Sequence, residues 1–114
     1  MDSCLFCRIA RKEIPARIVH EDDETIAFED INPQAPLHAL VIPRRHVATM
    51  NDFGPEDVAL IGQLLFVARQ LAVDRGHGET GYRIVTNCQA AAGQSVYHVH
   101  VHVLAGRSFG WPPG

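Results

Sequence analysis

The most constraining feature of the chain is the stretch 97–104, YHVHVHVL, in which histidine and valine alternate. Strict alternation of polar and apolar residues, rich in β-branched side chains, is typical of a half-buried strand. Because side chains in a strand point to opposite faces in turn, we expect His98, His100 and His102 to share one face while the valines face a core. The sequence therefore predicts a strand that carries three neighbouring imidazoles.

Three imidazoles in a row need a chemical explanation, because imidazole contributes little to packing and titrates near neutral pH. One interpretation is a solvated strand face, which accounts for one histidine better than for three. A second is a metal site, since histidine is a frequent ligand of zinc and copper. A third is phosphoryl chemistry, in which a neutral imidazole attacks phosphorus while its neighbours fix its tautomer and protonate the leaving group.

Length and charge restrict the classes of protein to consider. The 114 residues, 46% of them hydrophobic, suffice for one core and predict a single domain over residues 1–114. A net charge of −3 without a basic block argues against a nucleic-acid partner. No long apolar run and no signal-peptide pattern occur, so we expect no membrane partner and a cytoplasmic protein. Three cysteines do not predict a disulfide framework.

The other elements follow from periodicity and turn residues. A short helix is expected at 4–12, with Ser3 as its cap, and a long helix is expected from about 54–57 to Gly76. Further strands are expected at 16–20, 25–28, 38–42 and 82–86. The apolar positions of the long helix that should pack on the sheet are Val58, Ile61, Leu64, Leu65, Ala68, Leu71 and Ala72. This order predicts an α+β fold with a largely antiparallel sheet.

Two further segments carry polar chemistry. Cys4 and Cys7 have the spacing of half a zinc site, although two small buried hydrophobic residues would explain the pair equally well. A thioredoxin-type redox pair fits less well, because no strand precedes the motif. The loop 88–95 is rich in small residues, which let backbone N–H groups approach an anion closely.

The motif at 98–103 resembles the alternating pattern that gives the histidine triad (HIT) family its name. Four further segments resemble its HINT branch, over nearly the whole chain: DINPQAP at 30–36, VIP at 41–43, GQSVY at 93–97 and WPPG at 111–114. The resemblance implies a HIT-like fold, with a mostly antiparallel five-stranded sheet, one long helix, a short N-terminal helix and a two-fold homodimer. It also implies a purine nucleoside 5′-phosphoramidate hydrolase, which cleaves a P–N bond and releases AMP or GMP and an amine.

Two alternatives to that activity remain open. Other HIT branches hydrolyse dinucleoside polyphosphates or transfer nucleotidyl groups, but they lack the terminal tail, and the transferases replace the last histidine of the triad. A zinc-containing nucleotide-binding or interaction protein without significant catalysis is the alternative outside the enzymes. Activity of metal-free protein would separate enzyme from metal-binding module, because the HIT mechanism uses no metal in its chemical step.

The resemblance also implies roles for individual residues. His100 would be the nucleophile that forms a nucleotidyl-histidine intermediate, with its Nδ1 proton accepted by the carbonyl of His98. The other residues implied in catalysis are His102, His38, Ser95 and Asn87. Asp30 would bind the ribose hydroxyls, and backbone N–H groups in the segment Gly93–Gln94 would stabilise negative charge. The purine slot would consist of Leu5, Phe6, Ile9, Phe28 and Ile31.

The cysteine pair and the tail acquire partners through the same resemblance. Some HIT proteins bind zinc through such a pair plus two histidines, and the matching positions here are His46 and His98. With Cys4 and Cys7 they would form a closed structural zinc site. Trp111 would dock on the second protomer near its active site, because the prolines that follow cannot continue a strand. The long helix and the strand at 82–86 are the expected dimer surface.

Overall fold

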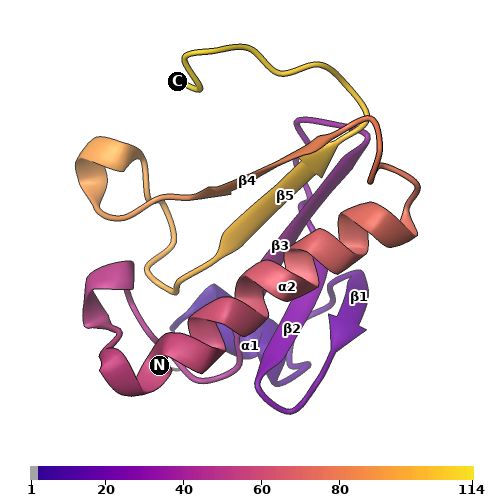
Figure 1. Ribbon diagram of the computed structural model, residues 1–114. Helices are drawn as coiled ribbons and strands as arrows, with labels where there is room; N and C mark the ends of the chain where they lie inside the picture. The colour runs from indigo at the N-terminus through magenta and orange to yellow at the C-terminus, as the bar shows by residue number, and fades with distance from the viewer. Residues whose placement is uncertain (1–2) are drawn as a thin grey trace.

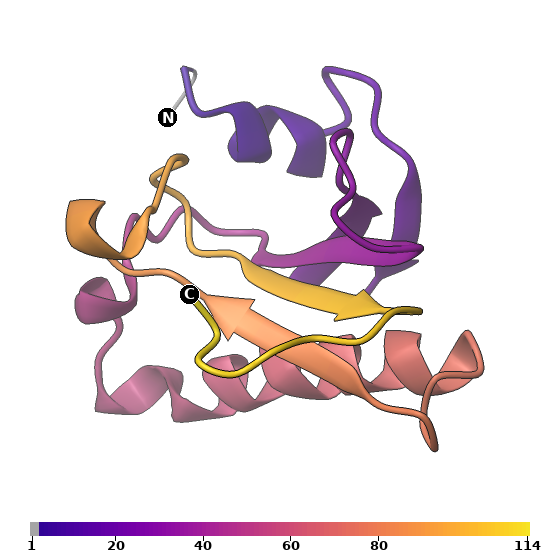
Figure 2. The same ribbon diagram turned by 90° about the horizontal axis from the view of Figure 1, so that it is seen from above.

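The structure is a computed structural model that describes residues 3–114. One antiparallel sheet has the strand order β1-β2-β3-β5-β4. Its strands are β1 (Ile18–Glu21), β2 (Thr25–Glu29), β3 (Leu37–Pro43), β4 (Tyr82–Thr86) and β5 (Val101–Ala105). The short helix α1 (Leu5–Ala10) lies on one face and the long helix α2 (Val58–Asp74) on the other (Figures 1 and 2). The predicted α+β fold, with a five-stranded antiparallel sheet and two helices, is confirmed.

Two apolar layers hold the helices on the sheet. On the α2 side, Val101 and Val103 of β5 pack against Leu64 and Leu71, all buried. On the α1 side, the buried residues are Phe6, Ile9, Ala10, Ile26, Phe28, Leu40 and Ile42. Burying one such aliphatic or aromatic side chain contributes about 1.5–3 kcal/mol. The valines of the histidine motif therefore anchor α2, which leaves the alternate side chains of β5 to the opposite face.

The buried face of α2 agrees with the prediction at Leu64, Ala68, Leu71 and Ala72. Val58 and Leu65 are 66% and 44% exposed, so their predicted packing on the sheet is wrong, whereas Leu60 and Val67 are buried. The reason is helical spacing, since Leu60 and Val67 lie four residues before Leu64 and Leu71 and share their side of the helix. A 3₁₀ turn at Pro55–Asp57 precedes α2, and the Asp57 carboxylate accepts the Gly54 N–H. The α-helical rotation thus begins at Val58. No helix among residues 3–114 combines the length and the hydropathy needed to cross a bilayer.

The histidine strand is shorter than predicted, because β5 begins at Val101 and includes only His102 of the three histidines. Val41 is the last β3 residue paired with β5. The ladder cannot extend to Pro43, which has no N–H to donate and whose carbonyl accepts a hydrogen bond from the His98 ring. The N-terminal helix is also shorter, from Leu5 to Ala10, and its cap is the sulfur of Cys4 rather than Ser3.

Candidate active site and metal-binding cluster

A cavity of about 300 Å³ opens between α1, the end of β2 and the segment before the histidine motif. The predicted site residues that line it are Leu5, Phe6, Ile9, Phe28, Asp30, Ile31, Ser95, His100 and His102. Sequence reasoning missed six further lining residues: Ile14, Pro15, Ala16, Glu29, Leu40 and Val96. Three of them could have been found from the sequence, because the apolar run 14–16 directly follows the first helix and has no other predicted role.

The apolar wall of this pocket is built around Phe6. Its ring packs edge-on against Phe28, with 5.3 Å between ring centroids, and against His100 at 5.1 Å. Phe6 and Phe28 are buried, whereas Ile31 is 99% exposed and therefore forms only the rim. An apolar, partly preformed slot of this size suits a flat heteroaromatic ring.

His100 has a defined tautomer. Its Nδ1 lies 2.8 Å from the carbonyl oxygen of His98, and because a carbonyl only accepts, Nδ1 must donate. A neutral His100 then carries no proton on Nε2, which keeps its lone pair. This buried imidazole lines the pocket, so a ring with one unprotonated nitrogen lies beside its apolar wall.

A second pair of histidines lies beside His100. The backbone N–H of Gln34 donates to His38 Nδ1 at 3.0 Å, and His38 Nε2 lies 2.9 Å from His102 Nδ1. Burial, helped by the neighbouring His100 and His38, lowers the pKa of His102 to about 4. Burial also lowers the pKa of His38, against the opposing effect of the Asp30 carboxylate 3.5 Å away. Both rings are therefore neutral at pH 7.

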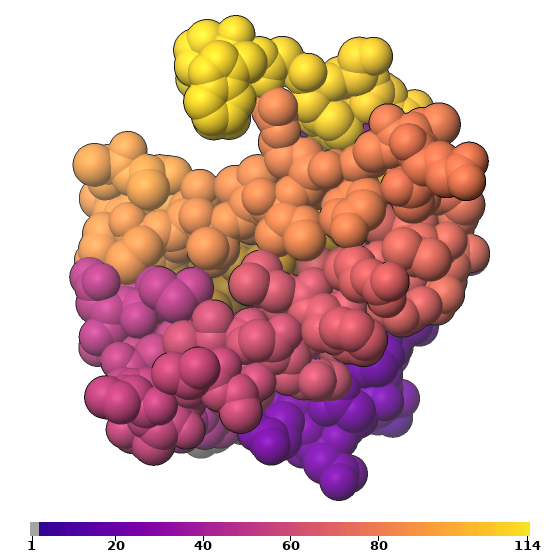
Figure 3. Space-filling model, viewed as in Figure 1, coloured from indigo at the N-terminus to yellow at the C-terminus, as the bar shows by residue number. Residues whose placement is uncertain are grey.

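Six residues predicted in catalysis or substrate binding are not among the lining residues of the pocket: His38, His98, Asn87, Gly93, Gln94 and Trp111. Asn87 directly follows β4, and Gly93 adopts the left-handed conformation after a short 3₁₀ turn. The buried side chain of Gln94 donates to the carbonyls of Ala48 and Val96, so it shapes this loop from within. Trp111, 85% exposed, belongs to a tail whose end stands off the body across a visible notch (Figure 3).

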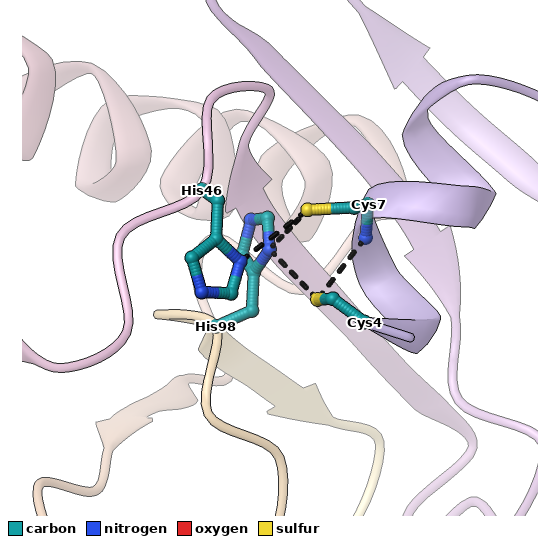
Figure 4. A group of neighbouring side chains, drawn as sticks. All are labelled: Cys4, Cys7, His46 and His98. Atoms are coloured by element: carbon teal, nitrogen blue, oxygen red, sulfur yellow. Dashed lines mark hydrogen bonds between the residues drawn. The ribbon is translucent and has the colours of Figure 1, made fainter. Parts of the chain in front are cut away.

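The four predicted metal ligands lie together at the start of α1 (Figure 4). His98 Nδ1 is 3.4 Å from the sulfur of Cys4 and 3.5 Å from that of Cys7, and His46 Nδ1 is 3.3 Å from Cys7 Sγ. In a tetrahedral centre with metal–sulfur and metal–nitrogen bonds of about 2.3 and 2.0 Å, sulfur and nitrogen would be about 3.5 Å apart. The donor set therefore has the spacing that a closed four-ligand metal site requires.

The hydrogen bonds and protonation states around His98 also fit a metal ligand. Its Nε2 donates to the carbonyl of Pro43 at 2.8 Å, which leaves the Nδ1 lone pair facing the two sulfurs. Burial lowers the pKa of His98 to about 4, so the ring is neutral. Burial, together with the hydrogen bond that the Cys7 thiol donates to Cys4, raises the pKa of Cys7 to about 11, so this thiol needs a nearby cation to ionise at neutral pH.

Comparison with known proteins identifies the family. Residues 3–110 match the family model described as "Scavenger mRNA decapping enzyme C-term binding". An uncharacterised HIT-like protein from Synechocystis sp. is 49% identical over 113 residues, which cover 99% of this chain and 98% of that protein. This chain belongs to the histidine triad family.

Solved structures of histidine triad proteins support this family assignment. The crystal structure of a HIT family hydrolase from Legionella pneumophila is 51% identical, with a TM-score of 0.96, over 98% of this chain and 100% of that one. A histidine triad protein from Clostridium difficile is 40% identical, with a TM-score of 0.91, over 96% and 95% of the two chains.

Proposed function

We propose that this histidine triad protein is a hydrolase that cleaves the P–N bond of purine nucleoside 5′-phosphoramidates. The observation that carries the proposal is the hydrogen bond from His100 Nδ1 to the His98 carbonyl, inside a pocket with an apolar slot. It prepares Nε2 to attack the α-phosphorus. The match to a HIT family hydrolase over the whole chain supports hydrolysis as the reaction class.

The reaction proceeds in two displacements at phosphorus. In the first, His100 Nε2 forms a bond to the α-phosphorus while the P–N bond of the substrate breaks, and the leaving amine takes up a proton from solvent. In the second, water attacks the nucleotidyl-histidine, the P–N bond to His100 breaks to release the nucleoside monophosphate, and the proton that the water loses returns to solvent. Asp30 binds the ribose hydroxyls. The phosphate and the leaving group form hydrogen bonds with the side chains of Ser95, His102 and Asn87. His38 supports His102, and backbone N–H groups at Gly93 and Gln94 stabilise the developing charge.

We propose phosphoramidates rather than dinucleoside polyphosphates as substrates because the chain carries the WPPG tail that resembles the HINT branch. The test measures turnover of a fluorogenic adenosine phosphoramidate beside a diadenosine polyphosphate, with His100→Ala as the inactive control. Higher kcat/KM for the phosphoramidate is expected. A preference for the polyphosphate would reassign the branch, and AMP binding without turnover of either substrate would make this a binding protein.

We propose that Cys4, Cys7, His46 and His98 hold a structural zinc ion. The two thiols and the two Nδ1 atoms supply four ligands within 4.8 Å of one another, which suits a closed tetrahedral site. The ion stabilises the fold by linking α1 to the loop that follows β3 and to the histidine motif. The chemical step belongs to His100 and needs no metal.

Metal analysis of the purified protein tests this site. About one zinc ion per chain is expected, and the double variant Cys4→Ala/Cys7→Ala should lose the zinc and unfold at a lower temperature. Cys88→Ala is the matched control, because this third free cysteine lies outside the cluster. Zinc-free wild-type protein, or a double variant as stable as the wild type, would contradict the proposal.

We propose further that the protein forms a two-fold homodimer through α2 and β4. The strand β4 is an edge of the sheet. The face of α2 opposite the sheet carries exposed apolar side chains at spacings of seven, eight and fifteen residues, which return to one side of a helix: Val58, Leu65, Phe66 and Val73. A helix that is apolar on both sides is typical of one that packs against a second partner.

Light scattering at micromolar concentration tests the dimer. The wild type should have twice the mass of one chain, and Phe66→Glu should shift the protein to monomer, because it places a charge in the apolar face. Ile31→Glu is the matched control, since Ile31 is at least as exposed but lies at the mouth of the pocket. A monomeric wild type, or equal effects of both substitutions, would contradict this interface.

A further inference from the structure

The root of the C-terminal tail is tightly packed on the loop that precedes β3. Gly106 has a φ of +96°, and a Cβ there would lie 2.8 Å from the Pro36 side chain. The next residue, Arg107, donates from Nε to the carbonyl of Gln34 at 2.8 Å and from Nη1 to that of Ser108 at 2.9 Å. The loop residue Gln34 is thus held by an arginine that belongs to neither the pocket lining nor the metal cluster.

Gln34 is also the first member of a hydrogen-bond chain that reaches the pocket. A backbone N–H can only donate, so the contact from Gln34 N to His38 Nδ1 requires a lone pair on that nitrogen. A neutral His38 then carries its proton on Nε2 and donates it to His102 Nδ1. A neutral His102 in turn carries its proton on Nε2. His102 lines the pocket, so it presents a hydrogen-bond donor there.

We propose that Arg107 is a positioning residue that fixes the tautomer of His102. By holding the Gln34 carbonyl, it keeps the Gln34 N–H on His38 and thereby keeps the proton of His102 on Nε2. In the opposite tautomer, His102 would donate from Nδ1, and His38 would need its proton on Nδ1, where it would face the Gln34 N–H. That arrangement leaves two donors pointing at each other, which the buried site disfavours.

The consequence for catalysis rests on the proposed function. A donor at His102 Nε2 can stabilise charge that develops on the phosphoryl group or on the leaving amine, and the opposite tautomer would present a lone pair to the same charge. Because the prolines at 33 and 36 and the Gly106 contact also hold the loop, loss of Arg107 should not abolish activity. A fall in kcat of about tenfold is expected, since part of the protein still adopts the productive tautomer.

The experiment compares Arg107→Ala with Arg83→Ala. Arg83 is the matched control, because it stacks on the same Phe109 ring as Arg107 and donates to the tail at Gly110. Only Arg107 bonds to the loop at Gln34. The readouts are the ¹⁵N NMR shifts of the His102 ring nitrogens at pH 7.5, the Kd for AMP, and kcat for the phosphoramidate.

In the wild type and in Arg83→Ala, the NMR shifts should identify His102 with its proton on Nε2. In Arg107→Ala they should show a mixture of tautomers, with a lower kcat and an AMP Kd within about twofold of the wild type. A wild-type His102 with its proton on Nδ1, an unchanged tautomer in Arg107→Ala, or equal tautomer shifts in both variants would overturn the proposal. The tautomer is measured in the protein without substrate. If the protein did not turn over the phosphoramidate, the proposed function would be rejected, but the NMR shifts would still decide whether Arg107 fixes the tautomer of His102.

Discussion

Acidification should destabilise this protein through His102, and the size of the effect follows from the partial burial of this ring. The pKa of this ring falls from 6.5 to about 4 on folding. Between pH 6.5 and pH 4, His102 is therefore protonated in the unfolded chain but not in the folded chain. The stability that a neutral His102 contributes is complete above pH 6.5 and is lost as the pH falls from 6.5 towards 4. The full difference between the two pKa values corresponds to about 3 kcal/mol, of which about 2 kcal/mol is lost by pH 5.0.

Urea unfolding at pH 7.5, 6.5 and 5.0, on the wild type and on His102→Gln, measures this effect. The variant will be less stable at pH 7.5, because it loses the contact with His38, but its free energy of unfolding should fall by about 2 kcal/mol less than that of the wild type between pH 7.5 and 5.0. His98, whose pKa is also lowered to about 4, titrates in both proteins and therefore cancels in the comparison. Parallel losses of stability in the two proteins would show that His102 does not resist protonation in the fold, and the reasoning would fail.

Three further outcomes are expected from substitutions in the pocket and the tail. His100→Ala should lose phosphoramidate turnover by several powers of ten while AMP still binds, as kinetics beside calorimetry would show; activity near that of the wild type would remove His100 as the nucleophile. Phe6→Ala should lower the free energy of unfolding by about 3–4 kcal/mol and weaken AMP binding, whereas Phe6→Leu should cost about 1–1.5 kcal/mol. Deletion of residues 111–114 should change the relative rates for different amine leaving groups and leave the dimer intact; unchanged relative rates would exclude a role for Trp111 in leaving-group recognition.

The sheet and the two helices could be predicted from local patterns, because alternation and helical periodicity depend on neighbouring residues alone. The start of the histidine strand could not, since it depends on Pro43, which is distant in sequence and whose carbonyl is bonded to His98. The buried face of α2 could be predicted only in part for a related reason. Leu64, Ala68, Leu71 and Ala72 are buried as predicted, but whether Leu60 and Val67 or Val58 and Leu65 join them depends on how α2 packs against strands that are distant in sequence.

The pocket shows the same division between local and distant information. The residues named by the histidine motif and by the cysteine spacing lie close together, because motifs of this kind record chemistry directly. Arg107 carries no such pattern, and the packing of the tail root against Pro36 brings it to the carbonyl of Gln34. Gln94 is predicted to meet the substrate through its backbone N–H, and the buried side chain, which donates to the carbonyls of Ala48 and Val96, could not be placed from the sequence.

The shortness of α1 gives the pocket and the cysteine cluster one common opening motion. A six-residue helix has no stability of its own in water and persists only through what it packs against. If it detaches, Phe6 leaves the apolar wall of the pocket at the same moment as Cys4 and Cys7 leave His46 and His98. Amide exchange at Arg8, whose N–H donates to the Cys4 carbonyl, and thiol alkylation at Cys7 should therefore follow one rate.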